Sequence, residues 1–97
     1  MNRIPNPNQA HSSISTTGTA STLAALGYTY NAATDVLLIQ AVGGDVRMTL
    51  NGTNPTASLG LKIADGATIE LCVEEAKAAK FITGASAPKL EIAAYVQ

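Results

Sequence analysis

Residues 36–52 read VLLIQAVGGDVRMTLNG, and this stretch decides the fold. Residues 36–42 are an almost continuous apolar run, short for a helix and rich in branched side chains, so we expect a central strand there. Gly43-Gly44 follows and permits the positive φ angles of a two-residue hairpin turn. Residues 45–50 then alternate as a half-buried strand does, and Asn51-Gly52 is the next turn signal. The positions expected on the inner face of this strand are Val46, Met48 and Leu50.

The rest of the chain repeats this pattern of short apolar strands and turns. Two expected strands, residues 61–64 and 67–73, flank Asp65-Gly66, which is a strong hairpin signal. Strands at this spacing, without a long helical pattern, predict an all-β fold: a small antiparallel β-sandwich or barrel of jelly-roll-like type. The other expected elements are a brief helical turn at residues 74–78 and strands at residues 80–83 and 90–96.

The N-terminal residues have a different composition. Residues 1–22 are rich in Asn, Pro, Ser, Thr and Gly and cannot bury enough surface to offset their own ordering entropy. We therefore expect an extended or flexible arm over residues 1–22 and a β-sandwich domain over residues 23–97. The arm is either a disordered tail or a segment that becomes ordered against a partner, with Ile4 and Ile14 as apolar pegs. Its residues 12–19 also suit an added strand at a sheet edge.

The start of the expected domain is ambiguous in its local structure. In residues 23–30, leucines at helical spacing favour a single helical turn, which Ser21 or Thr22 can cap and Gly27 can end. Tyr28-Thr29-Tyr30 is instead typical of a strand. We expect at most one helical turn here.

Composition excludes several classes of partner and site. The formal net charge is −1 and 13% of the residues are charged, so the basic stripe that phosphate binding requires is missing and we expect no nucleic acid. No run approaches the ~20 apolar residues of a membrane-spanning helix, and residues 1–5 lack the apolar core of a signal peptide, so we expect synthesis in the cytoplasm. Cys72 is the single cysteine and His11 the single histidine, which argues against a disulfide or a zinc site.

No catalytic constellation stands out in the sequence. A serine triad needs a histidine near its nucleophile, yet His11 lies in the expected arm. Glu74 and Glu75 are adjacent, but a solvated loop or helical turn explains them better than paired acid–base catalysis does. Gly43-Gly44 lacks the lysine and helix of a phosphate-binding loop. We therefore predict a non-enzymatic protein without cofactor or metal.

One part of the sequence resembles a known family. Residues 46–60 read VRMTLNGTNPTASLG, in which a strand ends at a glycine turn and a P-T-A-S-x-G loop follows. The order of the pieces after it, with a turn at Asp65-Gly66, strands like residues 68–71 and 79–82, and a closing strand like residues 89–96, is similar to small virion proteins of tailed bacteriophages. This resemblance covers about residues 35–97.

The resemblance implies a β-sandwich virion component. The first expectation is a capsid decoration (cement) protein, a homo-oligomer that binds and stabilises the lattice of the major capsid protein in the virion. A neck or tail ring, or a fibre-attachment component, is the alternative. A third hypothesis, a carbohydrate-binding β-sandwich, requires an aromatic platform on the surface. The partner contacts we predict are Ile4, Ile14, Tyr28 and Tyr30, with the loop of residues 54–58, including Asn54 and Pro55, as the alternative contact.

Overall fold

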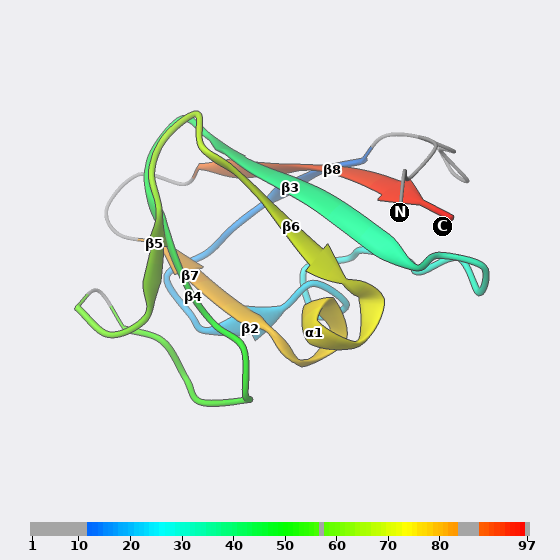
Figure 1. Cartoon of the computed structure of the whole chain (residues 1–97). Helices are drawn as coiled ribbons and strands as arrows, with labels where there is room; N and C mark the ends of the chain where they lie inside the picture. The colour runs from blue at the N-terminus through cyan, green and yellow to red at the C-terminus, as the bar shows by residue number, and fades with distance from the viewer. Residues whose placement is uncertain (1–11, 57, 84–87, 97) are drawn as a thin grey trace.

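The structure is a computed structural model that describes residues 12–56, 58–83 and 88–96 (Figure 1). One sheet contains β1 (Ser12–Ser15), β3 (Val36–Val42), β6 (Thr68–Cys72) and β8 (Lys89–Tyr95). The other contains β2 (Ser21–Thr22), β4 (Val46–Thr49), β5 (Leu61–Ile63) and β7 (Lys80–Thr83), and helix α1 (Val73–Ala78) connects β6 to β7. The strand orders are β1-β8-β3-β6 and β2-β7-β4-β5, and all pairs are antiparallel. The predicted all-β, sandwich-like fold is confirmed.

The chain crosses between the two sheets at glycine-containing bends. It passes from β3 to β4 through Gly43-Gly44 and from β5 to β6 through Asp65-Gly66. Because β3 pairs with β6 and β4 with β5, neither bend joins two strands that pair with each other, and the prediction of hairpin turns at these sites is wrong. The glycines do have the positive φ that the sequence signals, 95° at Gly43 and 87° at Gly66. A positive φ serves a bend from sheet to sheet as well as it serves a hairpin, and local sequence does not distinguish the two.

Hydrogen bonds between the two bends fix this corner of the sandwich. The backbone N–H of Asp65 donates to Oδ1 of Asp45 at 2.8 Å, and that of Gly43 donates to Oδ1 of Asp65 at 3.0 Å. The ammonium of Lys62 lies 3.1 Å from Oδ2 of Asp45. The hydrogen bond from Asp65 and then the one from Lys62 hold the pKa of Asp45 below its usual value.

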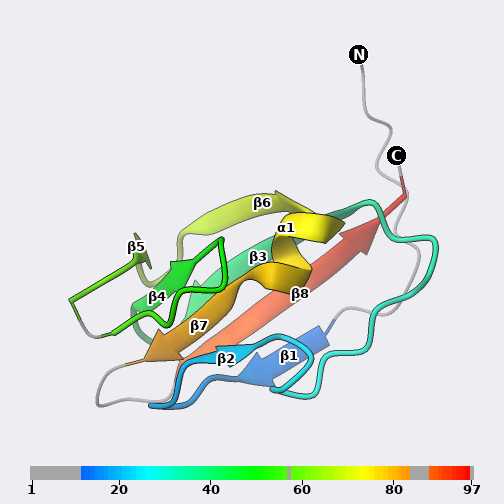
Figure 2. The same cartoon turned by 90° about the horizontal axis from the view of Figure 1, so that it is seen from below.

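The N-terminal part of the described chain forms one side of both sheets (Figure 2). β1 pairs with β8 in one sheet and β2 pairs with β7 in the other. Between them, the N–H of Thr16 donates to the carbonyl of Pro88 at 3.1 Å, and the N–H of Thr83 to the carbonyl of Thr17 at 3.0 Å. Ser12–Ser15 and Ser21–Thr22 therefore belong to the two sheets, residues 16–20 connect them, and the prediction of an edge strand is confirmed for Ser12–Ser15. Residues 1–11 lie outside the described residues.

The core lies between the two sheets. Val46 and Met48 are buried in it, as the alternation predicts. Leu50 is 37% exposed, so its expected place on the inner face is wrong, because β4 ends at Thr49 and the chain turns away. The largest fully buried side chains include Leu23, Leu37, Ile39, Phe81, Leu90 and Ile92.

Two short helical features match the sequence. The hydroxyl of Thr22 accepts a hydrogen bond from the N–H of Ala25 at 3.2 Å, and the turn it caps ends at Gly27, whose φ is 102°. The helical turn predicted at residues 74–78 is α1. Residues 28–30 are in extended connection rather than in a strand, so the strand signal there is wrong. This connection runs near β1 and forms the wall of a pocket.

Candidate interaction sites

The first candidate site is the connection from β4 to β5. We call residues 50–61, apart from residue 57, the leucine loop. Its three leucines are exposed: 37% for Leu50, 51% for Leu59 and 61% for Leu61. In the described part of the chain, Val42 is the one other large apolar side chain that is exposed to this degree. The exposed apolar surface is thus concentrated at one margin of the sandwich, which is typical of a contact surface.

Strand geometry explains why Leu61 is exposed. Leu61 pairs with Met48 across β4 and β5, and alternation places it on the same face as Ile63, two residues further along β5. Met48 and Ile63 are each only 2% exposed. Leu61 therefore belongs to the apolar face of the β4–β5 pair, but its side chain lies beyond the part of this face that is buried in the core.

The leucine loop is held in one shape by its own contacts. The hydroxyl of Thr56 accepts a hydrogen bond from the N–H of Leu59 at 2.9 Å, and the N–H of Thr56 donates to the carbonyl of Leu59 at 3.0 Å. Pro55 is fully buried. Oδ1 of Asn54 accepts from the ammonium of Lys80 on β7 at 2.8 Å. Such a compact, self-packed loop loses little conformational entropy when a partner binds it.

Gly60 anchors the end of this loop against β4. A Cβ atom at this position would lie 2.8 Å from the carbonyl oxygen of Met48, and the φ of Gly60 is +127°. Its carbonyl accepts a hydrogen bond from Nη1 of Arg47 at 2.9 Å. Glycine is therefore required here both by space and by backbone conformation.

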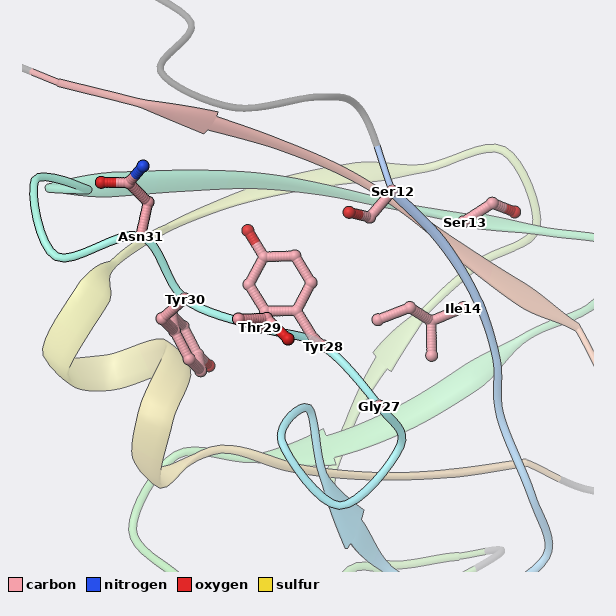
Figure 3. A pocket seen from close by; sticks show the side chains of 8 residues that line it. All are labelled: Ser12, Ser13, Ile14, Gly27, Tyr28, Thr29, Tyr30 and Asn31. Atoms are coloured by element: carbon pink, nitrogen blue, oxygen red, sulfur yellow. The ribbon is translucent and has the colours of Figure 1, made fainter.

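The second candidate site is a pocket of about 640 Å³ that opens to solvent (Figure 3). We call it the tyrosine pocket. One wall is formed by Ser12, Ser13 and Ile14 of β1, and the other by the connection of residues 27–31. The side chain of Ile14 points toward the ring of Tyr28. The described residues of the lining contribute hydroxyl, amide and apolar groups, and none of them has a charged side chain.

Two tyrosines give the pocket its polar character. The rings of Tyr28 and Tyr30 pack edge to face, with centroids 4.9 Å apart and planes at 85°, and the ammonium of Lys77 lies 5.6 Å from the Tyr30 centroid. Both hydroxyl oxygens are buried and have no hydrogen-bond partner within the described residues. Burial raises the pKa of Tyr28, and burial together with the neighbouring Tyr28 raises the pKa of Tyr30 to about 12.

The structure brings together three of the predicted contact residues, Ile14, Tyr28 and Tyr30, as lining of the tyrosine pocket. Ile14 is 8% exposed and Tyr28 5%, so both belong to this chain's own core. This corrects the expectation that Ile14 is a free peg: the pairing of β1 with β8 turns its side chain inward. Ile4 lies outside the described residues.

The alternative contact loop coincides with the leucine loop. Asn54 is exposed there, whereas Pro55 is buried and supports the loop from inside. Sequence reasoning did not single out Leu59 or Leu61, because apolar residues at alternating positions are normally assigned to a core. The available signal was their spacing on either side of Gly60, directly after a cluster of turn residues.

The described part of the chain contains few other groups that could form a binding or reactive site. No group of three or more His, Cys, Asp or Glu side chains there is placed to hold a metal ion, and no helix there is long and apolar enough to cross a membrane. Cys72 is exposed, and its thiol lies 3.3 Å from Oε1 of Glu75.

Comparison of the chain with protein-family models, curated proteins and solved structures finds no match.

Proposed function

We propose that this chain is a non-catalytic structural protein of a tailed-phage virion, a decoration protein that binds the major capsid lattice through the leucine loop. The observation that carries the proposal is the fixed display of Leu59 and Leu61 at one margin of the sandwich. The resemblance of residues 46–60 to tailed-phage virion proteins covers most of this same loop and supplies the virion context.

The loop has the composition of a small interface. Its leucines form an apolar centre, and polar residues such as Thr53, Asn54 and Ser58 surround them in the sequence. Burying a leucine side chain completely contributes about 1.5–3 kcal/mol, and these leucines are about half exposed, so each has part of that contribution left for a partner. A specific interface buries about 1,200–2,000 Å² in total, more than one loop offers. An oligomer of the chain, in which several leucine loops are linked, meets this requirement through avidity.

The alternative position, a neck or tail ring or a fibre-attachment component, uses the same surface. Copy number separates the two: a lattice carries copies in the hundreds, whereas a ring on the tail axis carries few. The carbohydrate-binding hypothesis requires a flat exposed aromatic platform. Tyr28 and Tyr30 pack edge to face and Tyr28 is buried, so these two rings do not provide one.

The test is association of the tagged chain with virions purified from the source culture, followed by a copy-number measurement. We expect the chain to be present, and the double variant Leu59→Asp/Leu61→Asp to lose at least about nine-tenths of the association, since buried carboxylates without a partner are costly. The matched control is Val42→Asp, which changes a residue of similar exposure, 42%, at the corner of the sandwich.

All three substitutions are at exposed positions and are expected to change stability by no more than about 0.5 kcal/mol. Circular dichroism of each purified variant checks this. Absence of the unmodified chain from virions would contradict the phage assignment. Equal loss from the Val42 variant would contradict the role of the leucine loop.

A further inference from the structure

The tyrosine pocket lies along an open sheet edge. Among the described residues, β1 pairs with β8 alone, and alternate residues of an edge strand direct their N–H and C=O groups away from the sheet. Three consecutive residues, Ser12–Ile14, form this wall of the pocket, and five consecutive residues, 27–31, form the facing wall. A space bounded by two extended segments fits an extended chain better than it fits a compact small molecule.

Tyr28 requires a hydrogen-bond acceptor from any molecule that occupies the pocket. Its side chain is 5% exposed and its hydroxyl has no hydrogen-bond partner within the described residues. Figure 3 shows this hydroxyl directed into the space between Ser12 and Asn31. A buried hydroxyl without a partner destabilises the folded protein, and an acceptor such as a backbone carbonyl removes that cost. The described lining residues are uncharged, and the hydroxyl of Ser13 among them donates to the carboxylate of Glu91, which favours a segment without acidic groups and with an apolar side chain to pack on Ile14.

The N-terminal segment of this protein has these properties. Residues 1–11 contain no acidic residue, one basic residue, Arg3, and one branched aliphatic side chain, Ile4. At about 3.3 Å per residue, eleven residues reach about 36 Å, and the longest dimension of the domain is 36 Å. The segment joins the sheet at Ser12, on the rim of the pocket. To enter its own pocket it would have to reverse direction immediately before Ser12, whereas a segment from a second copy needs no reversal.

We propose that the tyrosine pocket of one copy receives residues 1–11 of a second copy, in a reciprocal exchange about a two-fold axis. The incoming segment adds a strand to β1, a backbone carbonyl accepts the hydrogen bond of the Tyr28 hydroxyl, and Ile4 packs against Ile14. A two-fold arrangement satisfies both pockets with one kind of contact and closes the assembly. The inference deepens the proposed structural function by naming a partner, a second copy, and it rests on that function.

The experiment is sedimentation equilibrium of the full-length chain over a wide concentration range, with three variants. We expect a reversible dimer for the unmodified chain. Ile4→Asp places a charge in an uncharged pocket and raises the dimer Kd about tenfold or more. Tyr28→Phe removes one hydrogen bond and raises Kd several-fold. Val42→Asp, at an exposed position outside both candidate sites, leaves Kd unchanged.

Each contrary outcome is decisive. A chain that stays monomeric at every concentration, or an Ile4→Asp variant that dimerises like the unmodified chain, overturns the exchange. Hydrogen–deuterium exchange covers the case of a monomer: if Ile4→Asp raises exchange in β1 of a monomer, the segment occupies its own pocket and the second-copy proposal is wrong. Because the double variant Leu59→Asp/Leu61→Asp tests virion association and sedimentation tests the dimer, failure of this inference is distinguishable from failure of the proposed function.

Discussion

The leucine loop and the tyrosine pocket lie at opposite margins of the sandwich and differ in the kind of group they leave unsatisfied (Figure 2). In the leucine loop, the backbone N–H groups of Leu59 and Thr56 donate to a threonine hydroxyl and a backbone carbonyl of the same loop, so these polar groups are paired. The apolar side chains of Leu59 and Leu61 are exposed to solvent. In the tyrosine pocket, the apolar ring of Tyr28 is buried, and its polar hydroxyl lacks a partner. One margin offers apolar area, and the other offers a hydrogen-bond donor.

This difference determines what each margin gains from a partner. Burial of leucine is non-directional and roughly proportional to area, so the loop tolerates several orientations of its partner. A hydrogen bond to a buried hydroxyl requires a donor–acceptor distance and angle within narrow limits. The pocket is therefore suited to fix the register of one segment, and the loop to add affinity over a surface.

The largest expected effect concerns how firmly the leucine loop is held. Gly60→Ala is expected to destabilise the protein by about 2–4 kcal/mol, because the positive φ is strained for alanine and the new Cβ meets the Met48 carbonyl at 2.8 Å. Gly52→Ala in the same loop is the matched control. Its φ is +83° with nothing within 4 Å of the Cβ position, so the expected cost is about 1 kcal/mol.

Urea denaturation of both variants measures these costs. Equal costs at the two glycines would mean that the loop shifts away from Met48 without penalty. The leucine loop would then be an adaptable segment and not a fixed display, and the contrast with the tyrosine pocket would lose its basis.

The next effect in size concerns the unpartnered hydroxyl in the tyrosine pocket. Tyr28→Phe is expected to leave the stability of the monomer unchanged or raise it by up to about 1 kcal/mol, because no hydrogen bond is lost and a desolvation cost is removed. The matched control is Thr16→Val. The Thr16 hydroxyl is also buried but donates to the carbonyl of Pro88 at 2.5 Å, so its loss is expected to cost about 1 kcal/mol.

Thermal unfolding at low protein concentration checks this pair, since dimers are then few. A destabilised Tyr28→Phe monomer would show that the hydroxyl already has a partner when no second copy is bound. The pocket would then offer no donor, and its difference from the leucine loop would disappear.

The sequence predicts which residues form strands better than it predicts how the strands pair. Alternation at residues 46–49 and the turn glycines are local properties, and both are present in the structure. Pairing is decided by contacts distant in sequence, such as that of Val36 with both Cys72 and Tyr95. For this reason local sequence predicts hairpins at Gly43-Gly44 and Asp65-Gly66, where the chain bends from one sheet to the other.

The candidate sites were predictable only in part, for the same reason. Tyr28 and Ile14 are predicted as partner contacts, yet β1 pairs with β8, some 75 residues later, and this pairing turns Ile14 inward and makes β1 one wall of the pocket. Local sequence contains no information on that neighbour. Local sequence predicts Leu61 in a core strand at residues 61–64, whereas the structure leaves its side chain 61% exposed.

The smallest expected effect concerns Tyr30 and alkaline pH. Its pKa in the folded protein is raised to about 12, first by burial and then by the neighbouring Tyr28, while a tyrosine in the unfolded chain titrates near 10. Between pH ~10 and ~12 the unfolded chain has lost this proton and the folded chain has kept it. Stability therefore falls as pH rises through this window, and the contribution is fully present below pH ~10.

The measurement is the urea midpoint as a function of pH for the unmodified chain and for Tyr30→Phe. Tyr28 and Lys77 also face this ring, and both remain in the variant, so the difference between the two curves isolates Tyr30. We expect the variant to lose less stability on alkalinisation. Identical curves would mean that Tyr30 is hydrated in the folded protein, and the tyrosine pocket would then be an open surface of the same kind as the leucine loop.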